Sequence, residues 1–321
     1  MNPAHTGESG APGLNSIPEL PVIDLSAFPQ GPHQRAATAA AVEHALTQSG
    51  FMYVTGHGVD ATLLERAFAA MRQFFGQERE FKSGYAYTDI DANFGYQGTE
   101  VERLDPGSMP DLKESFTMRN ALQRADQIAR WPPGDFRDIA LALYAAAIGA
   151  AYRVMEVLAA CLALPPDYFA LRHRGENVTL RFLHYPAGMH VRSSAQLGAG
   201  AHTDYGSITL LFQDEVGGLE LLGQDGQWLP APPLHGAAVI NTGDLMERWT
   251  NGCFRSTVHR VRPISGNRDR YSIALFVDPD AAVEVECFES CVSAERPLRY
   301  SRITAGEHIR QKIAATHEGT E

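Results

Sequence analysis

The chain is predicted to be mainly β with packed helices (α+β), with a jelly-roll core that follows an N-terminal α/β extension. From residue 177 onward, short strand-like runs recur at regular spacing and are separated by turns, which is typical of a sandwich or jelly-roll barrel. The preceding part instead alternates strand-like runs with amphipathic helical segments. With 321 residues, of which 44% are hydrophobic and 20% charged, the chain can bury a large core.

The N-terminal half is predicted to contain two strand–helix pairs behind a polar tail. Residues 1–18 lack apolar periodicity and are expected to form a disordered tail. The strands are expected at 20–25 and 51–54, and the helices at 33–47 and 61–75. A loop-rich segment is expected at 85–120, and long helices at 135–163, which end before Pro165-Pro166.

The second half supplies the predicted jelly roll. Its strands are expected at 178–185, 208–212, 219–222, 237–241, 257–261 and 271–276, followed by a terminal helix at 302–315. The predicted organisation is a tail (1–18), an N-terminal domain (19–125), connecting helices (126–175), a jelly-roll core (176–280) and a C-terminal segment (281–321).

Net charge, cysteine content and the absence of a secretory signal indicate which partners and which cellular compartment to expect. The formal net charge of −11 argues against nucleic acid or an anionic membrane as the main partner. Four scattered cysteines predict free thiols in a reducing cytoplasm rather than a disulfide scaffold. The N-terminus shows no secretory signal, and the apolar run at 139–152 is shorter than the ~20 residues of a membrane span, so a buried helix is expected. We therefore expect a cytoplasmic monomer or weak homo-oligomer.

The sequence His202-Thr203-Asp204, with His259 much later, predicts a metal site. A strand places residues i and i+2 on one face, so His202 and Asp204 can point inward together if this segment is extended. Both lie in an apolar strand environment, where an uncompensated carboxylate and imidazole would cost several kcal/mol. Two histidines and a carboxylate without a thiolate favour Fe(II), with Mn, Co or Ni as inert competitors. Zinc is less favoured, because no HExxH motif supplies a general base.

A second pair, Arg270 and Ser272, predicts a carboxylate receptor. The same period of two places both side chains on one face of a strand, and the following Ile273-Ala274-Leu275-Phe276 indicates that this strand lines an interior. A guanidinium group matches a carboxylate with two parallel hydrogen bonds. Tyr185 either adds a hydroxyl group to the same anion or packs as an aromatic at a strand end.

Together these motifs resemble the iron- and 2-oxoglutarate-dependent dioxygenases of the isopenicillin N synthase-like family. The matching pieces in the second half are Gly198-Ala199-Gly200-Ala201-His202-Thr203-Asp204, Leu210-Leu211-Phe212-Gln213-Asp214, Asn241-Thr242-Gly243-Asp244, Ser256-Thr257-Val258-His259-Arg260-Val261 and Arg270-Tyr271-Ser272. Those in the first half are Pro21-Val22-Ile23-Asp24-Leu25, Gly50-Phe51-Met52-Tyr53-Val54 and Asp111-Leu112-Lys113-Glu114-Ser115-Phe116. The resemblance covers nearly the whole ordered chain.

The resemblance implies a double-stranded β-helix (jelly-roll) core and assigns roles to single residues. His202, Asp204 and His259 take the positions of the iron ligands. Arg270 and Ser272, assisted by Tyr185, take those of the receptor for 2-oxoglutarate, the cosubstrate beside Fe(II) and O2. One position departs from the pattern: many plant members carry Asn two residues before the tyrosine, whereas this chain has Leu183. Binding of 2-oxoglutarate is therefore expected to rest more heavily on Arg270.

The implied reaction couples oxidative decarboxylation of 2-oxoglutarate, to succinate and CO2, to hydroxylation, desaturation or cyclisation of a small organic substrate, as in specialised metabolism. No catalytic side chain beyond the metal ligands is expected, and Phe94, Tyr96 and Phe116 are predicted to form part of the substrate wall. Three alternatives stay open. They are a same-fold Fe(II)/O2 oxidase that does not use 2-oxoglutarate, an ethylene-forming oxidation of 2-oxoglutarate itself, and a non-catalytic metal-binding jelly-roll sensor.

Overall fold

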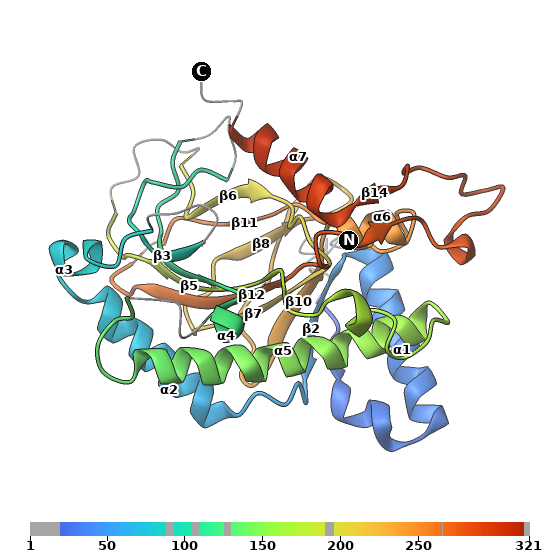
Figure 1. Cartoon of the computed structure of the whole chain (residues 1–321), viewed down its shortest axis with the longest axis horizontal. Helices are drawn as coiled ribbons and strands as arrows, with labels where there is room; N and C mark the ends of the chain where they lie inside the picture. Colours follow the sequence, from blue (N-terminus) through green and yellow to red (C-terminus); the bar gives the residue numbers. More distant parts are fainter. Residues whose placement is uncertain are drawn as a thin grey trace, which may run out of the picture.

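The computed structural model describes residues 20–87, 93–104, 109–124, 130–189, 196–264 and 266–317. Two β-sheets form its centre, and helices pack on the outside of the larger sheet (Figure 1). The mainly β architecture with packed helices, predicted from the sequence, is thereby confirmed. The tail predicted at residues 1–18 lies outside the described residues.

The larger sheet has eight strands in the order β1-β2-β10-β7-β12-β5-β4-β3. Their bounds are β1 Val22–Asp24, β2 Phe51–Thr55, β3 Phe94–Gln97, β4 Glu114–Arg119, β5 Val178–Tyr185, β7 Ile208–Gln213, β10 Ala238–Thr242 and β12 Arg270–Val277. Strands β1 and β2 run parallel, and the other neighbours are antiparallel. Strands from the first 120 residues therefore extend the core sheet at both edges.

The smaller sheet has four strands in the order β6-β11-β8-β9. These are β6 Ala199–His202, β8 Leu219–Leu222, β9 Trp228–Pro230 and β11 His259–Val261, while β13 Glu284–Val285 and β14 Ile303–Thr304 form a separate pair. A small apolar core that includes Phe51, Leu183, Leu221 and Val261 fills part of the space between the two sheets.

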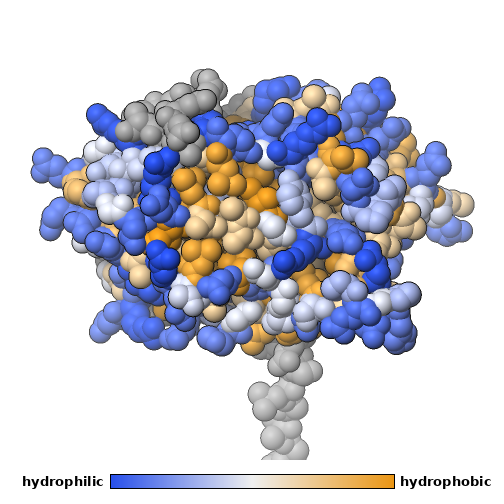
Figure 2. Space-filling view, turned by 60° about the horizontal axis from the view of Figure 1, so that its bottom comes forward, coloured by the Kyte–Doolittle hydropathy of each residue, from blue (hydrophilic) through white to orange (hydrophobic). Residues whose placement is uncertain are grey.

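The main apolar core lies between the larger sheet and its helices. The α-helices are α1 Pro32–Gln48, α2 Ala61–Phe75, α3 Arg79–Ser83, α4 Ala121–Arg124, α5 Phe136–Cys161, α6 Asp244–Trp249 and α7 Ala305–His317, and the 3₁₀ helices are η1 Leu25–Gln30, η2 Ala170–Arg172 and η3 Glu289–Cys291. Helix α5 buries Leu143, Tyr144, Ala147 and Leu158 in this core. Figure 2 brings the α2–α5 side forward and shows apolar surface at its centre, framed by hydrophilic residues.

Helix α5 contains the apolar run at 139–152. By length and composition alone α5 is long and apolar enough to cross a membrane, yet half of its most apolar window is buried inside the protein. Its position along the sheet explains that apolar sequence as part of the core (Figure 1). All four cysteines are free.

The prediction of a loop-rich segment at 85–120 is wrong in part, because this segment contains β3 and β4. Both faces of β4 are buried, with Phe116 and Met118 in the helix-side core and Ser115 and Thr117 on the opposite face. The polar residues alternate with the apolar ones as a strand requires, but the polar face is enclosed by protein instead of being exposed to solvent. Strands β9, β13 and β14 were also not predicted, and the strand expected to carry both His202 and Asp204 ends, as β6, at His202.

Candidate active site

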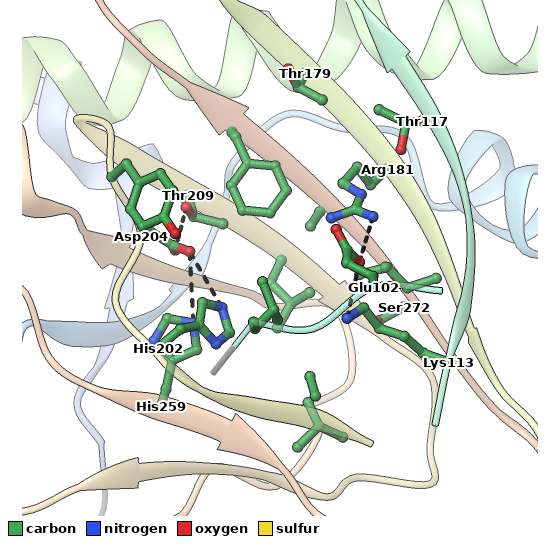
Figure 3. Close-up of a pocket in the computed structure, with 18 of the residues that line it drawn as sticks. Glu102, Lys113, Thr117, Thr179, Arg181, His202, Asp204, Thr209, His259 and Ser272 are labelled. Atoms are coloured by element: carbon green, nitrogen blue, oxygen red, sulfur yellow. Dashed lines mark hydrogen bonds and ion pairs between the residues drawn. The ribbon is translucent and has the colours of Figure 1, made fainter. Parts of the chain in front are cut away.

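Two histidines meet on neighbouring strands of the smaller sheet. His202 ends β6, His259 begins β11, and the two residues are directly paired in the antiparallel ladder. Asp204 lies two residues beyond the end of β6, and its Oδ1 is 3.8 Å from Nε2 of each histidine. One ligand atom from each residue lies within 4.8 Å of the other two. The structure thus brings together the three predicted metal ligands (Figure 3).

Hydrogen bonds fix which nitrogen of each histidine faces the centre. Nδ1 of His202 lies 2.7 Å from the carbonyl oxygen of Gly200, and Nδ1 of His259 lies 3.1 Å from that of Thr257. A carbonyl group only accepts hydrogen bonds, so each Nδ1 is the protonated donor. Each Nε2 therefore keeps its lone pair available for a metal.

Hydrogen bonds from neighbouring side chains also orient the carboxylate of Asp204. Its Oδ2 accepts hydrogen bonds from Thr209 Oγ1 at 2.6 Å and from Asn241 Nδ2 at 2.7 Å. These two bonds occupy one carboxylate oxygen and leave Oδ1 facing the two histidines. A ligand held by neighbouring hydrogen bonds in this way is typical of metal centres.

The charge state of the site suits a divalent cation. Burial, and then the neighbouring His259, lowers the pKa of His202 to about 4, so this imidazole is neutral at pH 7. Burial alone would raise the pKa of Asp204, but His259 and His202 hold it below its ordinary value. Two lone pairs and a carboxylate oxygen thus converge in a buried place, which is unfavourable unless a cation lies between them. This donor set fits Fe(II).

A buried arginine lies in the same cavity and has no ion-pair partner among the described residues. Arg270 is fully buried, and it donates from Nη1 to Ser272 Oγ at 3.1 Å and from Nη2 to Gln213 Oε1 at 3.0 Å. Its Cζ lies 4.6 Å from the ring centroid of Tyr185, which pairs with Arg270 across β5 and β12. Within the described ranges, Nε has no hydrogen-bond partner and no carboxylate contacts the guanidinium group. A buried cation in this setting favours an anionic ligand.

One cavity of about 740 Å³ joins the metal-ligand cluster to Arg270. Side chains from both sheets and from the C-terminal helix line it, among them Thr117, Arg119, Thr179, Arg181, Leu183, Tyr185, His202, Asp204, Leu211, His259, Arg270, Ser272, Ala274, Phe276, Ile309 and Ile313. The residues of β4, β5 and β12 in this set occupy alternate positions, as expected for one face of a sheet.

A charged network that the sequence did not reveal forms part of the same wall. Glu102 Oε2 lies 3.0 Å from Lys113 Nζ and 2.9 Å from Arg181 Nη2, and Lys113 also pairs with Asp111. Burial alone would raise the pKa of Glu102, but Arg181 and Lys113 hold it well below its usual range. The available signal was Arg181 inside the apolar strand β5, where a charged residue indicates a polar interior.

The predicted substrate wall of Phe94, Tyr96 and Phe116 is not found. Tyr96 pairs with Phe116 across β3 and β4, and both belong to the helix-side core, where Phe74 packs on each of them. Phe94 packs on Phe116 and Trp131. Successive strand residues point to opposite faces, so these aromatics face the helices, whereas Gln97, Ser115 and Thr117 have the opposite orientation. Gln97 and Thr117, not the aromatics, line the cavity.

Two family models match the chain. The model of the 2OG-Fe(II) oxygenase superfamily matches residues 176–279, and the model described as non-haem dioxygenase in morphine synthesis N-terminal matches residues 20–134. A 2-oxoglutarate-Fe(II) type oxidoreductase of Aspergillus fumigatus is 32% identical over 315 residues, which cover 93% of each chain.

Solved structures are similar over the same length. A full-length protein of Neurospora crassa, solved in complex with alpha-KG and thymine, has a TM-score of 0.83 and 31% identity, and the match covers 94% of this chain and 99% of that one. The dioxygenase for auxin oxidation of rice has a TM-score of 0.76 and 29% identity, with 92% and 96% covered. These matches, on a fold with a His-Asp-His cluster, show that the chain belongs to the 2OG-Fe(II) oxygenase superfamily and is an Fe(II)- and 2-oxoglutarate-dependent dioxygenase.

Proposed function

We propose that His202, Asp204 and His259 hold the Fe(II), and that Arg270 and Ser272 bind the distal carboxylate of 2-oxoglutarate with Tyr185 beside them. The enzyme then couples the decarboxylation of 2-oxoglutarate, to succinate and CO2, to oxidation of a small organic molecule in the 740 Å³ cavity. The observation that carries this assignment is the fully buried Arg270, which lacks a carboxylate partner within the described ranges and shares a cavity with the His-Asp-His cluster.

The surroundings of Arg270 support a role in carboxylate binding. Its described hydrogen-bond partners, Ser272 and Gln213, are neutral and leave the positive charge uncompensated. A buried charge of this kind costs several kcal/mol, which a bound anion offsets. Leu183, at the position where many plant relatives have Asn, offers no hydrogen bond, so the guanidinium group provides most of the recognition.

The remaining wall residues orient the reactants and exclude water. Iron supplies the oxygen-activating chemistry when it is bound. The Nδ1 bonds of His202 and His259 hold their rings in one tautomer, while Thr209 and Asn241 hold Asp204. Apolar side chains of both sheets line the cavity between the metal ligands and Arg270, including Leu211, Leu219 and Val261. Such a lining restricts bulk water, which protects a reactive oxidant from side reactions.

The assignment of Arg270 is tested by kinetics with 2-oxoglutarate. Arg270→Lys keeps the charge but loses the planar two-point contact. We expect the KM for 2-oxoglutarate to rise by about 10-fold or more, which corresponds to the loss of one charge-assisted hydrogen bond. Arg268→Lys is the matched control, because Arg268 is on the surface with a side chain 72% exposed. An unchanged KM in Arg270→Lys would show that the receptor lies elsewhere.

Product analysis separates the proposed reaction from its alternatives. Oxygen-dependent release of succinate from 2-oxoglutarate, stimulated by an organic compound, supports the proposal. Oxygen consumption with an organic substrate but without use of 2-oxoglutarate would indicate a same-fold oxidase. Ethylene release from 2-oxoglutarate alone would indicate that the cosubstrate is itself the substrate. Screening compounds for stimulated succinate release also identifies the substrate.

A further inference from the structure

A neutral amide contacts the guanidinium group of the proposed 2-oxoglutarate receptor, at a position where a carboxylate of the same shape would form an ion pair. Arg270 is fully buried, and its Nη2 donates to Gln213 Oε1 at 3.0 Å. Gln213 ends β7 and lies directly opposite Ser272 in the ladder with β12. Buried charges in proteins are usually paired, and glutamate has the length and shape of glutamine. An amide at this position therefore leaves a buried cation without the counter-charge that a closely similar side chain would supply.

Acidic residues adjacent in the sequence bind other groups instead of Arg270. Asp214 follows Gln213, and its Oδ2 accepts a backbone hydrogen bond from β12 at 2.6 Å. Asp269 precedes Arg270, and its Oδ2 lies 3.0 Å from His184 Nε2. Neighbours along a strand point to opposite faces, so both carboxylates are directed away from the guanidinium group. The chain thus has carboxylates close in sequence to Arg270, but their partners lie elsewhere.

Other cations of the cavity wall do have a carboxylate partner from the chain. Lys113 Nζ lies 3.0 Å from Glu102 Oε2, and Arg181 Nη2 lies 2.9 Å from the same oxygen. The wall can therefore accommodate internal ion pairs. Arg270 differs from these two cations because its partner across β7 and β12 is an amide.

The contacts of Gln213 fix the position of the guanidinium group. Nη1 of Arg270 donates to Ser272, Nη2 donates to Gln213, and the ring of Tyr185 lies 4.6 Å from Cζ. Arginine only donates hydrogen bonds, so the amide oxygen faces Arg270 and Nε2 faces the carbonyl oxygen of Ala231 at 3.4 Å. This second contact is long and neutral, so it is weaker than the hydrogen bond from the charged guanidinium group.

We infer that Gln213 is a positioning residue of the 2-oxoglutarate receptor. Its amide oxygen holds the guanidinium group of Arg270 in place, and its lack of charge keeps the cation unneutralised until the distal carboxylate of 2-oxoglutarate binds. A carboxylate at position 213 would occupy the receptor from within the chain. This inference rests on the proposed function, because it concerns the receptor that the proposed function assigns.

Gln213→Glu tests the inference, because it changes the charge at nearly constant shape. We would titrate 2-oxoglutarate, and separately 2-oxopentanoate, into anaerobic protein loaded with Mn(II) and measure the heat of binding. 2-Oxopentanoate has the same keto acid end but a methyl group in place of the distal carboxylate. The ratio of the two dissociation constants therefore measures recognition of that carboxylate. We expect Gln213→Glu to reduce the preference for 2-oxoglutarate by about 10-fold or more, as for the loss of a hydrogen bond between charged groups.

Two further variants complete the binding experiment. Gln227→Glu makes the same change of charge at an exposed position and should leave the preference unchanged. Gln213→Met leaves Arg270 without a counter-charge but removes the acceptor, so the preference should fall by only about threefold, as for one hydrogen bond. Gln213→Met keeps the test decisive if Gln213→Glu folds poorly, since an unchanged preference would show that the amide does not hold Arg270.

Stability measurements separate this role from a purely structural one. In the protein without ligands, Gln213→Glu supplies a counter-charge to Arg270, so the free energy of unfolding should rise or stay unchanged. In an Arg270→Met background the same substitution buries a carboxylate without its cation and should destabilise the protein. A residue needed only for packing, or for its contact with Ala231, would lower stability in both backgrounds.

The outcomes distinguish the role of Gln213 from the receptor assignment. A preference for 2-oxoglutarate that survives in Gln213→Glu, or an equal loss of stability in both backgrounds, would overturn the inference and leave the proposed function intact. If the unaltered protein binds 2-oxopentanoate as tightly as 2-oxoglutarate, the receptor assignment itself is wrong, and the role of Gln213 is refuted with it.

Discussion

The two faces of strands β4, β5 and β12 bury polar groups in opposite ways. On the helix side, the Glu114 carboxylate accepts from Lys82 Nζ at 2.8 and 2.9 Å, from His184 Nδ1 at 2.7 Å and from the hydroxyl group of Tyr96. On the cavity side, Arg270 has no carboxylate partner, and Arg181 Nε has no partner at all within the described ranges.

This contrast separates structural polar groups from functional ones. A buried charge with all its partners in place, such as Glu114, is part of the fold, and removing it leaves its partners without a counter-charge. A buried charge without such partners costs stability unless a ligand supplies the missing group. The same strands therefore stabilise the protein through one face and prepare a binding site with the other.

Asp204→Ala changes the cavity face, and it is expected to have the largest effect on activity of the variants described below. Loss of a residue that only supports a metal ligand already lowers activity or metal affinity by about 10–100-fold, so loss of the ligand itself is expected to reduce succinate release by more than about 100-fold. The metal-free protein should still fold, with a melting temperature lowered by a few degrees, because the change removes the acceptor of Thr209 and Asn241 but the counter-charge of no lysine or arginine among the described residues. Asp167→Ala, at an exposed position, is the control. Normal turnover with added iron would refute the metal assignment.

Glu114→Ala tests the opposite face and is expected to lower stability instead of ligand binding. It leaves Lys82, with a side chain 10% exposed, without its carboxylate, which costs about 3–5 kcal/mol for a buried pair. The free energy of unfolding, measured with denaturant, checks this. Glu284→Ala is the matched control, because its ion pair with Arg302 is on the surface and contributes about 1 kcal/mol or less. Equal effects of the two variants would contradict the structural role.

The loss of stability caused by Glu114→Ala should depend on pH, and its pH dependence follows from the pKa of Glu114. Burial alone would raise that pKa, but hydrogen bonds from His184, Lys82 and Tyr96 lower it below the ordinary value of 4.5. A carboxyl group whose pKa is lower in the folded protein stabilises the fold above its ordinary pKa and loses this contribution as the pH falls. The destabilisation caused by Glu114→Ala should therefore be complete at pH 7 and decrease progressively below pH 4.5. If the destabilisation caused by Glu114→Ala were the same at all pH values, Glu114 would not be ionised in the folded protein.

Several strands and one long helix could be predicted closely from the sequence because their signals are local. Strands β5 and β8 were predicted with the same bounds as in the structure, and so was helix α2, since apolar periodicity and flanking turns define each of them. His202 and Asp204 were expected on one strand, but β6 ends at His202. Their convergence depends on the turn that follows and on the bonds to Thr209 and Asn241, which sequence spacing does not encode.

The wrong substrate wall has a definite physical cause. Aromatic side chains in a loop are candidates for a substrate wall, but Phe94, Tyr96 and Phe116 lie in strands, where the position along the strand decides which face a side chain occupies. Phe116 and Thr117 are neighbours in β4, yet one lies in the helix-side core and the other on the cavity wall. The charged network of Glu102 and Arg181 joins residues that are far apart in sequence, so only the folded chain shows that these charges are paired.

Asp111→Ala tests whether a residue outside the metal cluster positions it. Asp111 Oδ1 accepts from the backbone N–H of Gly200 at 2.9 Å, and the carbonyl oxygen of Gly200 accepts from His202 Nδ1 at 2.7 Å. Removal of this acceptor should let β6 move and weaken Mn(II) binding by about 10-fold, measured by calorimetry. Asp111→Asn keeps the acceptor oxygen and should bind Mn(II) more tightly than Asp111→Ala. Equal affinities in both variants would show that the chain of bonds does not orient His202.

Arg270→Met gives the smallest expected change in stability and makes the comparison with Glu114 decisive. The variant replaces a buried cation, which contacts only neutral groups among the described residues, by an apolar side chain of similar length. Such replacements are often neutral or slightly stabilising, so the free energy of unfolding without metal and 2-oxoglutarate should change by about 1 kcal/mol or less. Binding of 2-oxoglutarate should be lost in the same protein. A loss of stability as large as that of Glu114→Ala would mean that Arg270 holds the fold together, and the distinction between the two faces would then fail.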